Sequence, residues 1–249
     1  MPRPKPSLQA LAAVAAGLAI ASTAAFALAA DDGTTAPRAA APFLDLRRQQ
    51  PVGGDAAAGK AASAACSTCH GANGIAVAPN FPNLAGQSAT YLYVQLKTFK
   101  AGQRVDPIMA AMAAPLDDAT MRNLAAYYAS LPPKAGAPTG DAPTAAAPAA
   151  ATLFSDGDPS RGIPPCQGCH GIAARGLPAG DGPDASRPHP PWSTIPRLRG
   201  QSGVYVAKAL RDFRDGARAG TSNAMVMHGV AGTLDDAEIQ ALADFIGAQ

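Results

Sequence analysis

One five-residue motif occurs twice in the 249-residue chain, and its two copies contain all four cysteines. The copies are Cys66-Ser67-Thr68-Cys69-His70 and Cys166-Gln167-Gly168-Cys169-His170. C-x-x-C-H is the attachment signature of haem c, in which both thiols bond to the porphyrin and the adjacent histidine binds the iron. The sequence therefore predicts two covalently bound haem c groups, with His70 and His170 as iron ligands.

Three other uses of paired cysteines fit the sequence less well. A zinc ribbon places its C-x-x-C pairs about 15–20 residues apart, whereas Cys69 and Cys166 are 97 positions apart. A thioredoxin-like pair lies near a βαβ pattern, and no strand-like run flanks either motif. A disulfide framework gives no reason for a histidine after each pair. Zinc binding and disulfide formation are kept as the alternatives to haem attachment.

Residues 1–29 have the features of an export signal. Arg3 and Lys5 precede an uncharged apolar run, which ends with the small-x-small cleavage sequence Ala27-Leu28-Ala29. Export would take the protein to the periplasm, where haem c is attached. The apolar run of about 23 residues is also long enough to span a bilayer. An uncleaved segment would therefore associate the protein with the membrane.

Composition and internal repetition divide the rest of the chain into two halves. Residues 30–52 are rich in Ala and Pro, which predicts a tether with no core of its own, and residues 135–148 predict a linker of the same kind. A surface loop inside one domain is the alternative for the second run. The halves, residues 53–134 and residues 149–249, match in three blocks at shifts of 100, 114 and 118 positions. Repetition on this scale predicts duplicated domains.

The apolar periodicity predicts an all-α fold for both halves. In each half we expect a helix, the attachment motif, a loop, a middle helix, a second loop and a terminal helix. The terminal helices have apolar residues at i, i+3, i+4 and i+7, namely Met121, Leu124, Ala125 and Tyr128 in the first half and Ile239, Leu242, Ala243 and Ile246 in the second. Aromatic residues make up only 5% of the chain, so each haem is expected to fill part of its core.

A methionine before each terminal helix is predicted to be the sixth iron ligand. Each half has two candidates, Met109 and Met112 in the first and Met225 and Met227 in the second. At the shift of 118, Met109 aligns with Met227, whereas Met112 aligns with Val230. We therefore predict Met109 and Met227, with Met112 and Met225 as alternatives. A thioether ligand completes the six-fold coordination of the iron and raises the reduction potential of the haem, and both features are typical of electron-transfer proteins.

Other polar residues are candidates for roles beside the haems. Pro82 and Pro196 occupy matching positions, and their carbonyl groups could accept a hydrogen bond from the ligating histidines. His189 and His228 are alternative iron ligands, although a surface position explains them more simply. Four further residues are candidates for binding haem propionates, namely Tyr91, Arg104, Tyr205 and Arg218. Helix packing or a solvated surface would explain these four residues equally well.

The pattern resembles class I cytochromes c, in which C-x-x-C-H lies near the N-terminus and the Met ligand precedes the last helix. More closely, it resembles the dihaem cytochrome c4 family, through tandem halves that each close with Leu-Asp-Asp and through the sequence Ala78-Pro79-Asn80-Phe81-Pro82-Asn83-Leu84-Ala85-Gly86-Gln87. The resemblance covers residues 53–249. It implies two tandem class I cytochrome c domains packed pseudo-symmetrically, with His/Met ligation at both haems. The tether, the linker and an insertion at about 177–192 depart from the family pattern.

The leading hypothesis is an electron carrier, not an enzyme. The resemblance implies electron transfer from quinol–cytochrome c reductase towards a haem–copper terminal oxidase. A net charge of +2 gives no indication of nucleic-acid binding. One alternative is the electron-accepting cytochrome subunit of a periplasmic dehydrogenase, whose haem sites would look the same. A dihaem peroxidase is a third hypothesis, but it needs an open sixth position, against which Met109 and Met227 argue.

Overall fold

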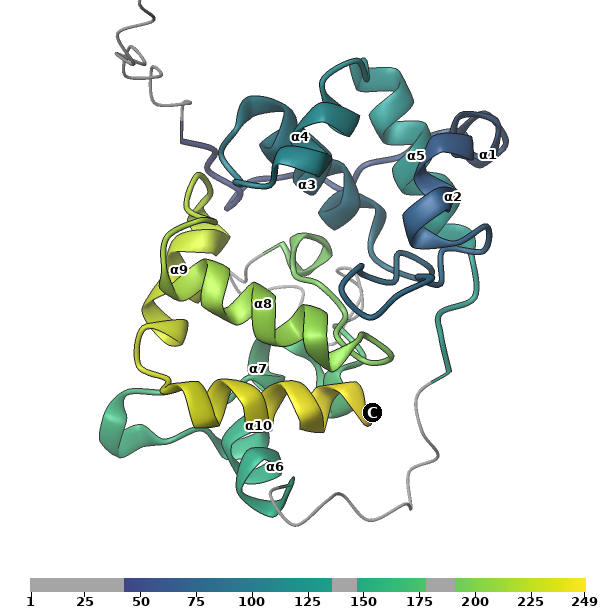
Figure 1. The fold of residues 1–249 in the computed structure, drawn as a ribbon. Helices are drawn as coiled ribbons and strands as arrows, with labels where there is room; N and C mark the ends of the chain where they lie inside the picture. The colour runs from purple at the N-terminus through teal and green to yellow at the C-terminus, as the bar shows by residue number, and fades with distance from the viewer. Residues whose placement is uncertain (1–42, 136–146, 178–190) are drawn as a thin grey trace, which may run out of the picture. The chain divides into compact units, whose positions relative to one another are not determined.

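Helices account for nearly all the regular structure in the described part of the chain (Figure 1). The computed structural model describes residues 43–135, 147–177 and 191–249. Within these ranges the β-structure consists only of isolated bridges, so the predicted all-α fold is confirmed. None of the helices in these ranges is both long enough and apolar enough to cross a membrane. The predicted export signal lies outside the described residues.

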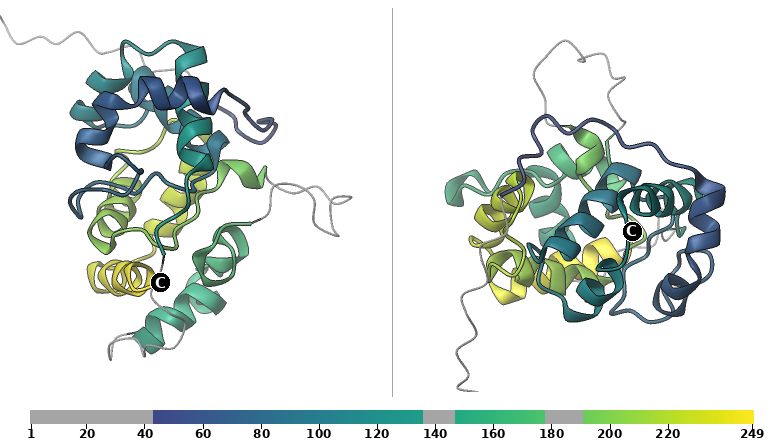
Figure 2. Two further views of the ribbon diagram at one scale, coloured as in Figure 1. Left: turned by 90° about the vertical axis from the view of Figure 1, so that its right-hand side faces the viewer. Right: turned by 90° about the horizontal axis from the view of Figure 1, so that it is seen from above.

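The first half is built on a crossing of two helices. Its helices are α1 (Ala56–Ala62), α2 (Ala64–His70), α3 (Ala89–Ala101), α4 (Pro107–Ala113) and α5 (Asp118–Ser130). Asp55 caps α1 by accepting hydrogen bonds from the backbone N–H groups of Ala57 and Ala58. At Gly59 α1 meets α5 so closely that a Cβ atom would lie 1.9 Å from the carbonyl oxygen of Asn123. Glycine is therefore required for this crossing, which can be followed in Figure 2.

The second half repeats this plan with a different first helix. Its helices are α6 (Ala147–Asp156), α7 (Gln167–His170), α8 (Gly203–Arg214), α9 (Ser222–Ala231) and α10 (Asp236–Gly247). Phe154 of α6 packs against Phe245 of α10, with ring centroids 5.6 Å apart. Asp235 and Glu238 form a capping box at the start of α10, which fixes where that helix begins. Helix α10 also packs along α8 (Figure 1).

The segments that contain the candidate methionines differ from the prediction. We expected loops there, whereas the structure has helices α4 and α9. Asp106 caps α4 by accepting from the backbone N–H of Met109, and Pro107 occupies a first-turn position where no N–H is needed. Thr221 caps α9 in the same way. These capping residues are visible in the sequence and would have predicted both helices.

Residues 43–52 also differ from the predicted free tether. Leu46 is 2% exposed and Val52 is buried, and both belong to the apolar core of the first half. The backbone N–H of Val52 donates to Thr90 Oγ1 of α3 at 2.9 Å. Isolated apolar residues in an Ala/Pro-rich context gave too weak a signal to indicate this packing. At the other boundary, residues predicted to end the linker are the first residues of α6.

Candidate haem sites

The two attachment motifs hold their histidines in the same geometry. His70 Nδ1 lies 2.9 Å from the carbonyl oxygen of Pro82, and His170 Nδ1 lies 2.9 Å from that of Pro196. A carbonyl oxygen can only accept, so the proton is on Nδ1 and the lone pair is on Nε2. This is the tautomer in which an imidazole binds a metal through Nε2. The hydrogen bonds predicted for the two proline carbonyls are therefore present.

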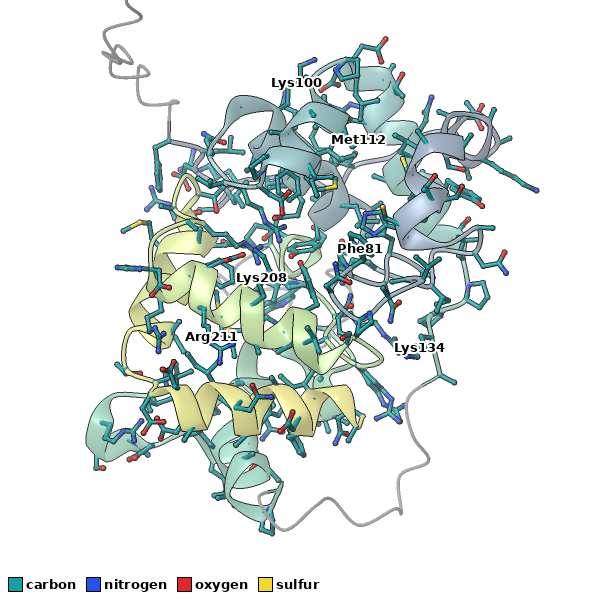
Figure 3. All side chains as sticks on the ribbon, in the orientation of Figure 1. Phe81, Lys100, Met112, Lys134, Lys208 and Arg211 are labelled. Atoms are coloured by element: carbon teal, nitrogen blue, oxygen red, sulfur yellow. The ribbon has the colours of Figure 1, made fainter. Side chains whose placement is uncertain are left out.

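Burial keeps both imidazoles in the form that can bind iron. His70 and His170 are buried, and this burial lowers the pKa of each ring, against the smaller raising effect of its carbonyl hydrogen bond. Neutral imidazole is the ligand form. Phe81, from the loop after α2 (Figure 3), lies edge-on to His70 with ring centroids 6.2 Å apart. The ring of His70 is thus fixed by a hydrogen bond and by an aromatic contact.

A cavity of about 250 Å³, lined mainly by the second half and on one side by residues of the first, collects the predicted ligands of one haem. Cys166, Cys169, His170 and Met227 all line it, with apolar side chains of α8, α9 and α10 around them. Burial raises the pKa of the Cys166 thiol to about 11, as expected for sulfur in an apolar environment. An apolar cavity with paired thiols, one imidazole and one thioether matches the chemistry of a haem c macrocycle, so the residues fit this group.

The methionine candidates differ in where they lie. Met227 lines the cavity, whereas Met225 is 49% exposed. In the first half Met109 is half-buried, whereas Met112, labelled on α4 in Figure 3, is 37% exposed. These placements favour Met109 and Met227, the pair that the repeat selects. Iron ligation by this pair stays a prediction.

The alternative metal-binding residues find little support. The exposed His228 places Nδ1 2.7 Å from the carbonyl oxygen of Phe213, and His189 lies outside the described residues. The four cysteines form no disulfide. Within the described ranges, no three His, Cys, Asp or Glu side chains come together as a metal site would require. The zinc and disulfide interpretations therefore have no support in this part of the chain.

Two buried arginines border the same cavity. Arg104 is 9% exposed and Arg218 is 6% exposed, and their backbones form an antiparallel bridge between the halves. Arg104 donates to the hydroxyl of Tyr205 at 3.0 Å, and Arg218 donates to that of Tyr91 at 3.3 Å. Both guanidinium groups also donate to Gln95 Oε1. Neither forms an ion pair with a carboxylate of the described residues.

A buried guanidinium without a carboxylate is costly, because burial removes the water that solvated its charge. Each guanidinium lies against an aromatic ring, 4.5 Å from the centroid of Phe99 for Arg104 and 4.0 Å from that of Phe213 for Arg218. Cation–π contacts and neutral acceptors offset only part of this cost. A pair of positive charges at the edge of an apolar cavity is suited to an amphipathic ligand that carries carboxylates.

Reciprocal glutamine contacts join the two halves. The side-chain amide of Gln87 accepts from the backbone N–H of Arg197 at 2.9 Å and donates to its carbonyl oxygen at 2.8 Å. Gln201, which matches Gln87 at the shift of 114, does the same with the backbone of Asn83, at 2.9 Å and 2.7 Å. The contacts are thus related by a pseudo-two-fold axis.

We expect Gln87→Ala and Gln201→Ala each to lower the free energy of unfolding of the haem-loaded protein by about 1–3 kcal/mol. Each change leaves one backbone N–H and one C=O without their partner, and an unsatisfied buried group costs an amount of this order. Guanidinium unfolding followed by haem absorption measures the loss. Gln240→Ala is the control, since that side chain bonds the exposed Asp244 on its own helix. Wild-type stability in both interface variants would contradict this account of the interface.

Comparison with known proteins identifies the family. The sequence matches the Cytochrome c family over residues 56–132 and residues 148–249. Cytochrome c4 of Pseudomonas aeruginosa is 37% identical over 203 residues, which cover 82% of this chain and 92% of that protein. A thiosulfate dehydrogenase electron acceptor of Thiomonas intermedia is 37% identical over 188 residues, covering 75% of this chain and 79% of that protein.

Solved structures agree with these matches. The crystal structure of reduced recombinant cytochrome c4 from Pseudomonas stutzeri superposes with a TM-score of 0.65 at 38% identity, covering 78% of this chain and 98% of that one. A thiosulfate dehydrogenase from Marichromatium purpuratum has a TM-score of 0.62 at 32% identity, covering 77% of this chain and 40% of that one. The predicted resemblance, the tandem cytochrome c fold and the two haem c groups are thereby confirmed. The chain belongs to the cytochrome c4 family of dihaem electron carriers.

Proposed function

We propose that each domain holds its haem by one cysteine pair and by one histidine and one methionine. The first set is Cys66, Cys69, His70 and Met109, and the second is Cys166, Cys169, His170 and Met227. The observation that carries the proposal is the matched pair of Nδ1–carbonyl hydrogen bonds, which prepares Nε2 of both histidines for iron. The haem, when bound, supplies a one-electron Fe(III)/Fe(II) couple.

The polypeptide then sets the potential of each couple and does no substrate chemistry. Burial of His70 and His170 keeps water away from both imidazoles, and their carbonyl hydrogen bonds increase the basicity of the rings that would bind iron. Arg104 and Arg218 would bind the propionates of the second haem, since both line its cavity and neither forms an ion pair with a carboxylate of the described residues. Positive charge at this edge favours the reduced iron, which has one positive charge fewer.

We expect Met227→Ala and Met109→Ala each to remove about half of the sulfur-to-iron charge-transfer band of the oxidised protein. Each would also make one haem high-spin, because no other thioether replaces the ligand. Met225→Ala and Met112→Ala are the matched controls and should leave the spectrum unchanged. Loss of the band in either control variant would reassign the ligand to the exposed methionine of that half.

Quinol–cytochrome c reductase is the electron donor in this proposal, and a haem–copper terminal oxidase is the acceptor. The support is the similarity to cytochromes c4 over most of the chain. Acceptance of electrons from a periplasmic dehydrogenase is the second candidate, favoured by two relatives called thiosulfate dehydrogenase electron acceptors and by the structural similarity to a thiosulfate dehydrogenase.

Both roles require export through the segment 1–29, with cleavage after Ala29 or retention as an anchor. A dihaem peroxidase is disfavoured by the position of Met227 in the cavity.

Stopped-flow reduction of the oxidised protein distinguishes the two donors. We expect quinol–cytochrome c reductase with quinol to reduce both haems at least ten-fold faster than a thiosulfate dehydrogenase with thiosulfate, at equal enzyme concentrations. Horse cytochrome c in place of this protein controls for the activity of each donor. Faster reduction by the dehydrogenase would replace the first donor by the second candidate.

A further inference from the structure

We propose that residues 43–52 form an interdomain strap, which positions the loop leading into α9 and closes the second haem cavity. The strap precedes residue 56, where the match to the Cytochrome c family begins. It therefore lies outside the residues that match this family model. The proposal rests on the proposed function in one respect, since it assigns Met227 of α9 to the second haem.

The strap binds three consecutive residues at the start of α9. Leu44 forms a parallel bridge with Thr221, in which its N–H donates to the carbonyl oxygen of Gly220 at 2.8 Å. The N–H of Ser222 donates to the carbonyl oxygen of Leu44 at 3.1 Å. The N–H of Leu46 donates to Ser222 Oγ at 2.9 Å. Because Ser222 is the first residue of α9 and lies five positions before Met227, the strap fixes the helix that carries the thioether.

The same strap is anchored in the first domain. Leu46 belongs to one buried cluster with Leu92 and Val94 of α3. At the far end, the backbone of Val52 is held by Thr90 through the hydrogen bond described above. Side chains alternate along the strap, with Leu44 and Leu46 turned inward and Asp45 and Arg47 exposed, as in a half-buried strand. The strap thus connects the first core with the loop of the second domain.

The first domain also holds this loop directly. The N–H of Val105 donates to the carbonyl oxygen of Ala217 at 2.9 Å. Gly220 lies so close to Gln103 that a Cβ atom at this glycine would be 2.3 Å from the Cβ of Gln103. The loop is therefore confined between the strap and the first domain, and it cannot shift without breaking contacts on one of the two sides.

Leu46 has a second role, because it lines the second haem cavity as well as the first core. Its side chain is 2% exposed and forms part of the cavity wall on the side of the first domain. Solvent exclusion is one of the protein's means of raising a haem potential. The strap therefore acts on the second haem in two ways, through the position of Met227 and through the closure of the cavity by Leu46.

Leu46→Ala in the haem-loaded protein tests the strap, with Phe43→Ala as the matched control, since Phe43 is 58% exposed. Two readouts are needed, amide hydrogen exchange of residues 217–226 and a redox titration that resolves two potentials. The potential of the second haem is the one that moves in Met227→Ala. We expect Leu46→Ala to accelerate exchange in 217–226 at least ten-fold and to lower the second potential alone, and Phe43→Ala to change neither.

Unchanged exchange and unchanged potentials in Leu46→Ala would overturn the proposal. Faster exchange with both potentials unchanged, or an equal fall in both, would also overturn it, because the strap would then only contribute to stability. Should Leu46→Ala fail to mature, Ser222→Ala removes the acceptor of the Leu46 N–H without altering the core, and it should give the same changes at smaller size. Failure of Met227 as the ligand is detected separately, by the spectra of Met227→Ala and Met225→Ala.

Discussion

The loop that orients each motif histidine is the loop that the opposite domain holds. Pro82 accepts the hydrogen bond from His70, and the next residue, Asn83, has its backbone paired with Gln201 of the second domain. Pro196 accepts from His170, and Arg197 after it is paired with Gln87 of the first domain. Ligand orientation and domain packing therefore depend on the same two short segments. A displacement between the domains would change the orientation of both imidazoles.

The internal duplication also places two buried positive charges at the boundary between the domains. Arg104 and Arg218 occupy matching positions, and each reaches the tyrosine of the other domain, Tyr205 or Tyr91. Two buried guanidinium groups side by side repel one another unless an anion compensates them. Haem carboxylates would supply this compensation at the cavity that both arginines line. Binding of the cofactor and association of the domains would then stabilise one another.

Much of the site could be predicted from the sequence because its determinants are local. The spacing of C-x-x-C-H fixes the thiols and the histidine on one helical turn, and the repeat selects Met109 and Met227 by position alone. The helices around the methionines were missed, although Asp106 and Pro107 carry the capping signal of α4 and Thr221 carries that of α9.

Non-local contacts could not be predicted in this way. The glutamine contacts join residues 110 and 118 positions apart, and Leu46 bonds a residue 176 positions away. Nothing in the composition of residues 30–52 indicates such partners. The alternation of Leu44, Asp45, Leu46 and Arg47 is too short to predict a strand-like strap by itself. Pairings of this kind depend on how the two halves pack.

The central claim is that the chain carries two haems, each ligated by one histidine and one methionine. The most direct test is the absorption spectrum of the periplasmically matured wild-type protein, oxidised and reduced, with haem quantified per chain. The account predicts two haems per chain, low-spin oxidised iron at both, and a sulfur-to-iron charge-transfer band with the intensity expected for two sites. One haem per chain, or a high-spin component in the oxidised protein, would contradict it.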